Sequence, residues 1–268
     1  MDDVRLVATD LDRTLLLSGG KLPPNFWDYV RRLNDAGVLV VPASGRPLPT
    51  LREMFSRPGY DIALISDNGA VVEQGGEIVH RSLMAPEDYL AMVELTQNET
   101  DGVPLVVGVD HGYLPTSARH LEDHLSMFFR NLVFTDDFSK IDEDVVKFSA
   151  FFPEADAQEA FDNHFTPAFG DTHSVTLGGP PWVDVMNAGV TKGEGLEMLA
   201  SRLGLEKSQL MAFGDALNDV EMLASAGHSY AVANAVPEVL EQAEHTTASN
   251  EDLGVLQVWD QLLDSKES

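Results

Sequence analysis

Cysteine is absent from this chain of 268 residues. Disulfide bonds, thiolate metal sites and a cysteine nucleophile are therefore excluded, although the absence does not identify a compartment. Basic residues are also scarce: 17 Lys and Arg face 44 Asp and Glu, for a formal net charge of −27. Because so acidic a protein repels nucleic acids and anionic membranes, we expect neither as a partner. The acidity could instead serve cation binding, solubility or life in a high-salt cytoplasm.

Long hydrophobic runs are lacking as well. No apolar run approaches the ~20 residues of a membrane-spanning helix. The first residues, MDDVRLVATDLD, contain neither the basic segment nor the long apolar segment of a signal peptide. We therefore expect a cytoplasmic protein. The hydrophobic content of 44% supports a sizeable core, in one large domain or two smaller ones.

Both ends of the chain alternate short apolar runs with amphipathic stretches. Near-continuous apolar strands alternating with helices predict a parallel sheet covered on both faces, which is a Rossmann-like three-layer α/β core. The expected strands are 4–9, 38–43, 62–66, 210–213 and 230–233. The expected helices are 24–36, 49–55, 192–204, 218–226, 237–243 and 252–263.

The middle of the chain has a different pattern. Its predicted strands come in neighbouring pairs, which indicates an antiparallel α+β insert at 83–187 between core segments 1–82 and 188–268. The expected strands are 104–109, 145–152, 174–178 and 182–186, and the expected helices are 86–98, 117–127 and 155–165. We expect this insert to act as a cap that closes over the site. Trp182 and His173 are candidates to contact a substrate, although a role in the core is the simpler expectation for Trp182.

Polar or small residues follow four of the predicted core strands. In a parallel α/β sheet, ligands bind at the carboxyl ends of the strands, so these residues are candidates for one cleft. Each motif alone could be an ordinary turn or helix start. Together they are an acid pair, a serine, a lysine and a second acid pair in chain order. The strand ends contribute Asp10 and Asp12, Ser44 and Gly45, Asp67 to Gly69, and Asp215, Asn218 and Asp219, and the VTKG segment at 190–193 contributes Lys192.

This set of side chains suits phosphoryl transfer. A carboxylate such as Asp10 can attack phosphorus and form a covalent aspartyl-phosphate. A phosphate and a carboxylate repel each other, so we expect a Mg²⁺ ion bound by Asp10 and Asp215, with Asp219 just outside. Asp12 can act as general acid and base, since residues i and i+2 of a strand point the same way.

The remaining residues of the set would hold the phosphate. Ser44 and the backbone N–H groups after it, beginning with Gly45, can bind the phosphoryl oxygens. Lys192 can stabilise the developing negative charge.

The motifs resemble those of the haloacid dehalogenase superfamily, and in particular the Cof-type phosphatases with a C2-type (IIB) cap. DLDRTLL is similar to the first motif, SGR to the second, TKG to the third and GDALNDVEML to the fourth. The resemblance implies a Mg²⁺-dependent phosphatase acting on a small phosphorylated metabolite, such as a sugar phosphate. It implies Asp10 as nucleophile, Asp12 as acid/base with its carbonyl on the metal, and Asp215 and Asp219 at the metal. It also implies Ser44, Gly45, Lys192 and Asn218 at the phosphate.

Two positions depart from the family pattern. The residue after the acid pair is usually Gly and is Arg13 here, and the usual MGNA is VANA at 232–235. Arg13 could clamp an anionic substrate, obstruct the site or simply face solvent. Alternatives to a phosphatase are a phosphomutase of the same superfamily and a catalytically degenerate member that only binds a ligand. A response-regulator receiver uses similar residues but is much shorter.

Overall fold

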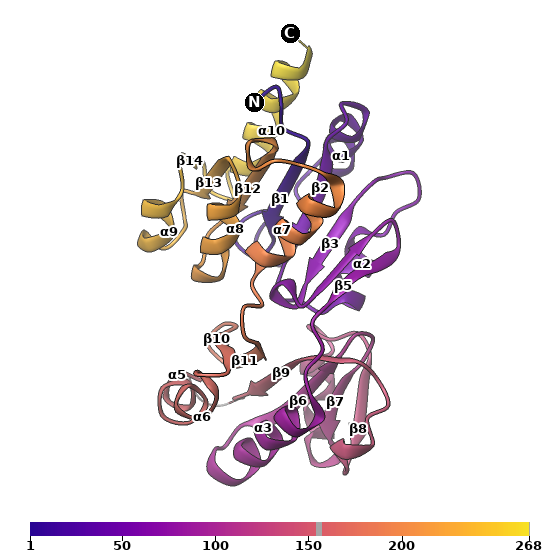
Figure 1. Cartoon of the computed structure of the whole chain (residues 1–268), viewed down its shortest axis with the longest axis vertical. Coiled ribbons are helices and arrows are strands. Elements are labelled where there is room, and N and C mark those ends of the chain that lie inside the picture. Colours follow the sequence, from indigo (N-terminus) through magenta and orange to yellow (C-terminus); the bar gives the residue numbers. More distant parts are fainter. Residues whose placement is uncertain (154–156, 268) are drawn as a thin grey trace. The chain divides into compact units, whose positions relative to one another are not determined.

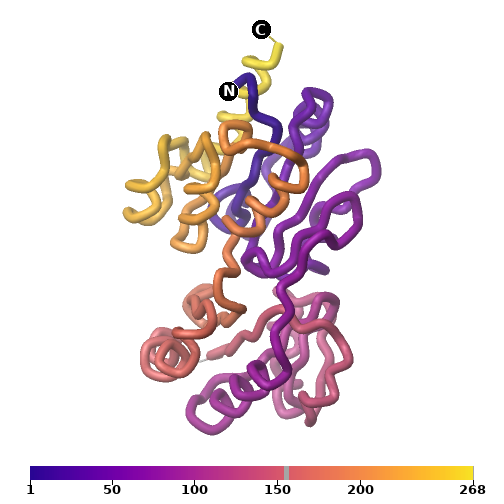
Figure 2. The backbone as a smooth tube through the Cα atoms, in the orientation of Figure 1, coloured from indigo at the N-terminus to yellow at the C-terminus, as the bar shows by residue number. Residues whose placement is uncertain are grey.

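The computed structural model describes residues 1–153 and 157–267. It separates into two compact units. The first comprises Met1–Ser44, Phe55–His80 and Thr191–Ser268, and the second comprises Gly45–Met54 and Arg81–Val190. The chain leaves the first unit, builds most of the second, and returns (Figure 2). The sequence-based boundaries at 82/83 and 187/188 stay a prediction of how the chain divides into domains.

An eight-stranded sheet forms the centre of the first unit, in the order β14-β13-β12-β1-β2-β3-β4-β5 (Figure 1). Strand β1 lies between β12 and β2 and is parallel to both. All five residues of β1 are buried, as its apolar sequence predicts. The strands are β1 Leu6–Asp10, β2 Leu39–Ala43, β3 Ala63–Ser66, β4 Val71–Gln74, β5 Glu77–Arg81, β12 Leu210–Gly214, β13 His228–Val232 and β14 His245–Thr247.

The parallel core of this sheet is confirmed, but its edge was not predicted. Strand β4 pairs antiparallel with β3 and is followed by β5. The turn between β4 and β5 consists of Gly75 and Gly76, whose φ angles of 61° and 80° favour glycine. The two glycines between apolar stretches were the available signal for this hairpin.

Helices cover both faces of the sheet. Helix α1 contacts β2 and also α10, where the rings of Phe26 and Trp259 are 6.0 Å apart. Helices α7 and α8 contact each other and form the other layer with α9. The helices of this unit are α1 Phe26–Asp35, α7 Lys192–Leu203, α8 Val220–Ser225, α9 Pro237–Gln242 and α10 Gly254–Glu267, whereas α2 Leu48–Phe55 belongs, except for its last residue, to the second unit. The two ends of the chain lie side by side, since Lys266 Nζ donates to the carbonyls of Asp2 and Val4 (Figure 2).

The second unit contains a six-stranded sheet in the order β10-β11-β9-β6-β7-β8. Its pairs are antiparallel as predicted, except that β7 and β8 are parallel. Apolar clusters lie on both faces, and Trp182 belongs to one of them. The strands are β6 Val103–Gly108, β7 Gly112–Pro115, β8 Leu132–Thr135, β9 Val145–Phe151, β10 His173–Leu177 and β11 Trp182–Asn187.

Two helix predictions for this unit need correction. Helix α3, Pro86–Glu99, agrees with the expected 86–98. The expected helix 117–127 is instead a 3₁₀ turn at Thr116–Leu121 followed by the short α4, Glu122–Leu125. The expected helix 155–165 begins outside the described residues. Its described part runs through α5 Gln158–Ala160, a π-helical turn at Phe161–Phe165 and α6 Thr166–Phe169. Among the described residues, no helix is both long and apolar enough to span a membrane.

Candidate active site

The central strands of the first unit bring two distant aspartates together. Asp10 is the last residue of β1, and Asp215 directly follows β12, the neighbouring parallel strand. Both side chains are buried. Thr14, in the turn after β1, donates its hydroxyl to Asp215 Oδ1 at 3.2 Å. The parallel register therefore joins residues that are 205 positions apart in the chain.

Lys192 supplies a buried cation to this site. Its Nζ lies 2.6 Å from Asp10 Oδ1 and 2.7 Å from Asp219 Oδ1, and its side chain is 1% exposed. Lys192 is the first residue of α7, and the hydroxyl of Thr191 caps this helix by accepting from the N–H of Glu194. A buried ammonium group with two carboxylate partners is firmly oriented.

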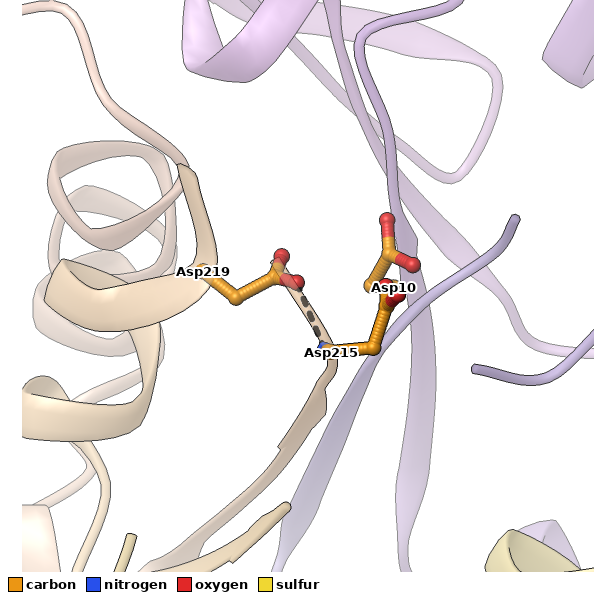
Figure 3. Close-up of side chains that lie close together, drawn as sticks. All are labelled: Asp10, Asp215 and Asp219. Carbon is orange, nitrogen blue, oxygen red and sulfur yellow. Dashed lines mark hydrogen bonds between the residues drawn. The ribbon is translucent and has the colours of Figure 1, made fainter. Parts of the chain in front are cut away.

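Asp219 has both carboxylate oxygens engaged. Oδ1 accepts from Lys192, while Oδ2 accepts the backbone N–H groups of Asp215 at 2.9 Å and Ala216 at 3.0 Å. Figure 3 shows the contact with Asp215 as a dashed line. A side chain at Gly214 would place a Cβ 2.4 Å from the Cβ of Asp219, so glycine permits this close approach. Asp219 thereby holds the loop that presents Asp215.

The three aspartates fit a hard divalent cation. Asp10, Asp215 and Asp219 each offer one carboxylate oxygen, and these three oxygens lie within 4.8 Å of one another (Figure 3). All three residues are buried. Asp10 Oδ2 is buried and has no hydrogen-bond partner among the described residues. Burying a carboxylate oxygen without a partner destabilises the folded protein unless a hydrogen-bond donor or a cation binds it. Carboxylate oxygens are the ligands that Mg²⁺ and similar ions prefer.

The charges of the cluster shift the acidity of its members. Burial raises the pKa of Asp10 to about 8; Asp219 and Asp215 add to the rise, and Lys192 opposes it. Burial likewise raises the pKa of Asp215 to about 6, with a further rise from Asp219 and an opposing effect of Arg13. Burial alone would lower the pKa of Lys192, but the carboxylates of Asp10 and Asp219 outweigh it and raise that pKa. The cluster thus carries an excess of negative charge that a bound cation would offset.

Asp12 lies differently from what the strand argument predicted. Strand β1 ends at Asp10, so Asp12 lies in the following turn, where its backbone forms a bridge with Leu16. The side chain of Asp12 is exposed, whereas that of Asp10 is buried. The alternation of side chains within a strand therefore does not explain this pair. The role of Asp12 as acid and base stays a prediction that rests on the family resemblance.

The expected phosphate-binding residues are distributed over both units. Ser44 directly follows β2, and its carbonyl accepts from the N–H of Asn68 at 3.0 Å. Asn218 Nδ2 donates to Asn68 Oδ1 at 3.0 Å, so in this structure its amide contacts Asn68. Gly45 belongs to the second unit, where its carbonyl accepts from the buried Lys147 Nζ at 2.8 Å.

Two residues of interest, Thr14 and Lys147, were not selected from the sequence, and Asn68 was selected only as part of the polar turn at 67–69. Thr14 holds Asp215, and Asn68 holds Asn218. The φ of Asn68 is 55°, a left-handed value for which Asn is enriched, and its place in SDNGA was a usable signal. Lys147 is 2% exposed within the mostly apolar strand β9. A lone lysine in the run VVKFSAFF was the signal for it.

Comparison with known proteins connects this geometry to a family. The profile of a family described as haloacid dehalogenase-like hydrolases matches residues 7–258. The HMP-PP phosphatase of an Enterobacter species is 30% identical over 244 residues, which cover 90% of this chain and 88% of the relative. The 5-amino-6-(5-phospho-D-ribitylamino)uracil phosphatase YbjI of Escherichia coli is 27% identical over 265 residues, which cover 97% and 96%.

A solved structure extends the comparison to the fold. The subclass IIB sugar phosphatase BT4131 superimposes with a TM-score of 0.79 at 22% identity, covering 96% of this chain and 98% of that one. The match therefore includes the segments of both compact units. At this identity it concerns the fold alone.

Proposed function

Because the chain belongs to the haloacid dehalogenase-like hydrolases and is a phosphoric monoester hydrolase, we propose that it cleaves a small phosphorylated metabolite through an aspartyl-phosphate on Asp10. The observation that carries this proposal is the carboxylate of Asp10 itself. Lys192 holds Oδ1 at 2.6 Å, and Oδ2 is buried without a hydrogen bond among the described residues. One oxygen is thus fixed and the other remains for reaction or for a metal.

The proposed reaction has two displacements at phosphorus. The Asp10 carboxylate forms a bond to phosphorus as the bond to the ester oxygen breaks, and Asp12 gives a proton to that leaving oxygen. Asp12 then takes a proton from water, whose oxygen attacks the phosphorus of the aspartyl-phosphate. The bond to Asp10 breaks, which releases inorganic phosphate and restores the carboxylate.

Asp10 and Asp215 are the proposed ligands of Mg²⁺, with the backbone carbonyl of Asp12 as a further ligand. Asp219 would lie just outside these ligands and orient them. When bound, the ion neutralises the charge shared by the carboxylates and the phosphate. Asp219 orients Lys192 and the backbone of Asp215 through both of its oxygens. Lys192 keeps one carboxylate oxygen of Asp10 engaged and adds a fixed positive charge beside the reaction centre.

The substrate is proposed by class. The sequence led us to expect a sugar phosphate, and the names of the two curated relatives describe a phosphorylated ribitylamino-uracil and HMP-PP. We propose a small phosphorylated metabolite of one of these kinds and draw no distinction among them. The cytoplasm as the place of action stays a prediction from the sequence.

Release of inorganic phosphate by the purified protein tests this function. We expect turnover of p-nitrophenyl phosphate and of at least one phosphorylated sugar or heterocycle, with Mg²⁺ present and without a bisphosphate activator. EDTA should abolish the activity, and excess Mg²⁺ should restore it. Asp10→Asn should remove turnover while leaving the circular dichroism spectrum unchanged, and Asp12→Asn should lower kcat by roughly 10²–10⁴-fold.

The alternatives lead to different results. Transfer of phosphate between positions of one sugar, only with a bisphosphate present, would identify a phosphomutase. Binding of a phosphorylated metabolite without any turnover would identify a degenerate, ligand-binding member. A fully active Asp10→Asn variant would refute the proposed nucleophile.

A further inference from the structure

Arg13 has a backbone conformation that favours glycine. Its φ is 67°, in the left-handed region where a residue with a Cβ is strained. Two hydrogen bonds join it to Asn234, which follows β13. Arg13 Nη2 donates to the carbonyl of Asn234 at 3.1 Å, and Asn234 Nδ2 donates to the carbonyl of Arg13 at 2.8 Å. The turn after β1 is therefore tied to the loop after β13 from both directions.

This attachment continues into a network. Asn234 Oδ1 accepts the N–H of Asn250 at 3.1 Å, and Asn250 Nδ2 donates to the carbonyl of Leu16 at 2.8 Å. The turn that carries Arg13 is thus held at two points, residues 13 and 16. The hydrogen bond to Asn234 accordingly gives the guanidinium group a defined position even though 65% of the side chain is exposed.

The guanidinium group lies beside Asp215. Arg13 Nε is 3.7 Å from Asp215 Oδ2, and the Asp215 side chain is 3% exposed. The other oxygen, Oδ1, accepts the hydroxyl of Thr14. Both oxygens of this proposed metal ligand therefore face a donor or a cation supplied by the turn after β1. Asp10 Oδ2 has no such partner among the described residues.

We propose that Arg13 is a positioning residue that acts as a built-in counter-cation for Asp215 and thereby weakens the binding of the catalytic Mg²⁺. This inference rests on the proposed function, because it takes Asp215 as a metal ligand. A fixed positive charge beside a ligand both offsets the ligand's negative charge and repels an incoming divalent ion. The same charge stabilises the metal-free cluster of acids. Arg13 therefore reduces the free-energy difference between the metal-free and the metal-bound protein, which is the free energy of Mg²⁺ binding.

Isothermal titration of the metal-free protein with MgCl₂ tests this, without any substrate. Arg13→Gln removes the charge but keeps a side chain at the same φ. We expect Mg²⁺ to bind roughly 3- to 30-fold more tightly to this variant, as one partly screened unit charge would produce. Arg13→Lys keeps a positive charge near Asp215 and should bind Mg²⁺ within about twofold of the original protein.

Two further variants separate charge from other effects. Arg31→Gln removes an exposed arginine of α1 whose ion pair is with Asp28, so it changes the net charge equally. It should leave the Mg²⁺ affinity unchanged. Arg13→Gly removes the charge and also the backbone strain. It should bind Mg²⁺ as tightly as Arg13→Gln but melt at a higher temperature in EDTA.

Thermal melting gives a second measurement. The rise in melting temperature on adding Mg²⁺ should be larger for Arg13→Gln than for the original protein, because the metal-free state has lost a stabilising charge and the metal binds more tightly. An Mg²⁺ affinity of Arg13→Gln within twofold of the original would overturn the proposal, whether or not the enzyme is active. An equal gain in Arg31→Gln would overturn it too, by showing a general charge effect. Absence of Mg²⁺ binding to the original protein would instead refute the metal site of the proposed function.

Discussion

At the scale of single residues, the carboxyl group of Asp10 illustrates how burial governs this site. Its pKa is raised by burial from 3.8 to about 8 in the metal-free protein. Between these values the folded chain binds a proton that the unfolded chain has lost. The folding stability contributed by this group is therefore fully present below about pH 4 and is lost as the pH rises through 8.

Asp10→Asn removes this titration and provides a test of it. In EDTA, we expect the melting temperature of Asp10→Asn relative to that of the original protein to increase steadily from pH 5 to pH 8. The reason is that, over this range, Asp10 of the original protein keeps its proton when folded and releases it on unfolding, so a rising pH favours the unfolded state of that protein alone. Thermal melts at three pH values measure the difference. A difference that shrinks as the pH rises would contradict the raised pKa.

Lys192 supplies the opposing charge, and its loss should be costly. Lys192→Met leaves Asp10 and Asp219 without their shared ammonium partner. Removing one partner of a buried ion pair lowers the free energy of unfolding by about 3–5 kcal/mol. Urea unfolding at pH 7.5 in EDTA measures this change. Lys140→Met is the matched control, because that lysine forms an exposed surface pair with Asp137, and its loss should lower the stability far less. Equal losses in both variants would contradict the structural importance of the buried pair.

At the scale of elements, the turn after β3 packs closely against the start of α7. Asp67, Asn68 and Gly69 all have positive φ, which is rare for three consecutive residues. A Cβ at Gly69 would lie 2.1 Å from the carbonyl oxygen of Thr191, the residue before Lys192. This turn and the first residue of α7 are therefore packed backbone against backbone. Any displacement of one should move the ammonium group that contacts Asp10.

Gly69→Ala should consequently lower both stability and activity. We expect the free energy of unfolding to fall by more than about 2 kcal/mol, because a backbone clash adds to the left-handed strain of about 1–2 kcal/mol. We also expect a reduced kcat, because Lys192 is displaced. Gly75→Ala is the control: its φ is 61° and a Cβ would meet nothing within 4 Å, so only the strain applies. Chemical unfolding and kcat measured on both variants test the comparison, and an unchanged kcat in Gly69→Ala would refute the coupling.

At the scale of the whole molecule, the segments that leave and re-enter the first unit are joined by one side chain. Asn187 Nδ2 donates to Ser82 Oγ at 2.9 Å and to the carbonyl of Leu83 at 2.8 Å. The ends of the predicted insert 83–187 are therefore close enough for a short linker. Helix α2 would lose contacts in such a truncation, since Thr50 donates to the carbonyl of Phe128.

Replacing residues 83–187 by a short Gly-Ser linker tests the predicted division into domains. We expect a folded core of reduced stability that still hydrolyses p-nitrophenyl phosphate, because Asp10, Lys192, Asp215 and Asp219 all remain. It should no longer discriminate among phosphorylated metabolites. Circular dichroism and a substrate panel provide the measurements. Undiminished discrimination by a folded core would show that the insert does not select the substrate.

The local pattern of strands and polar strand ends follows from the sequence alone. Apolar runs followed by Asp10 and by the GDALND segment predicted the buried strands β1 and β12 and the polar residues at their ends. These features depend on neighbours in the chain: burial of a short apolar strand, and glycine at the close of a helix such as Gly204, whose φ is 68°. The order of the motifs then sufficed to recognise the family.

The contacts between distant side chains follow from the three-dimensional arrangement of the strands. Lys192 meets Asp10 across 182 positions, and Arg13 meets Asn234 across 221. Local propensity contains no information about such pairs, because they follow from the order and register of strands far apart in the chain. The sequence left Arg13 with three possible roles. Its left-handed φ, its bond to Asn234 and its 3.7 Å approach to Asp215 became visible only when the strands carrying these residues were placed side by side.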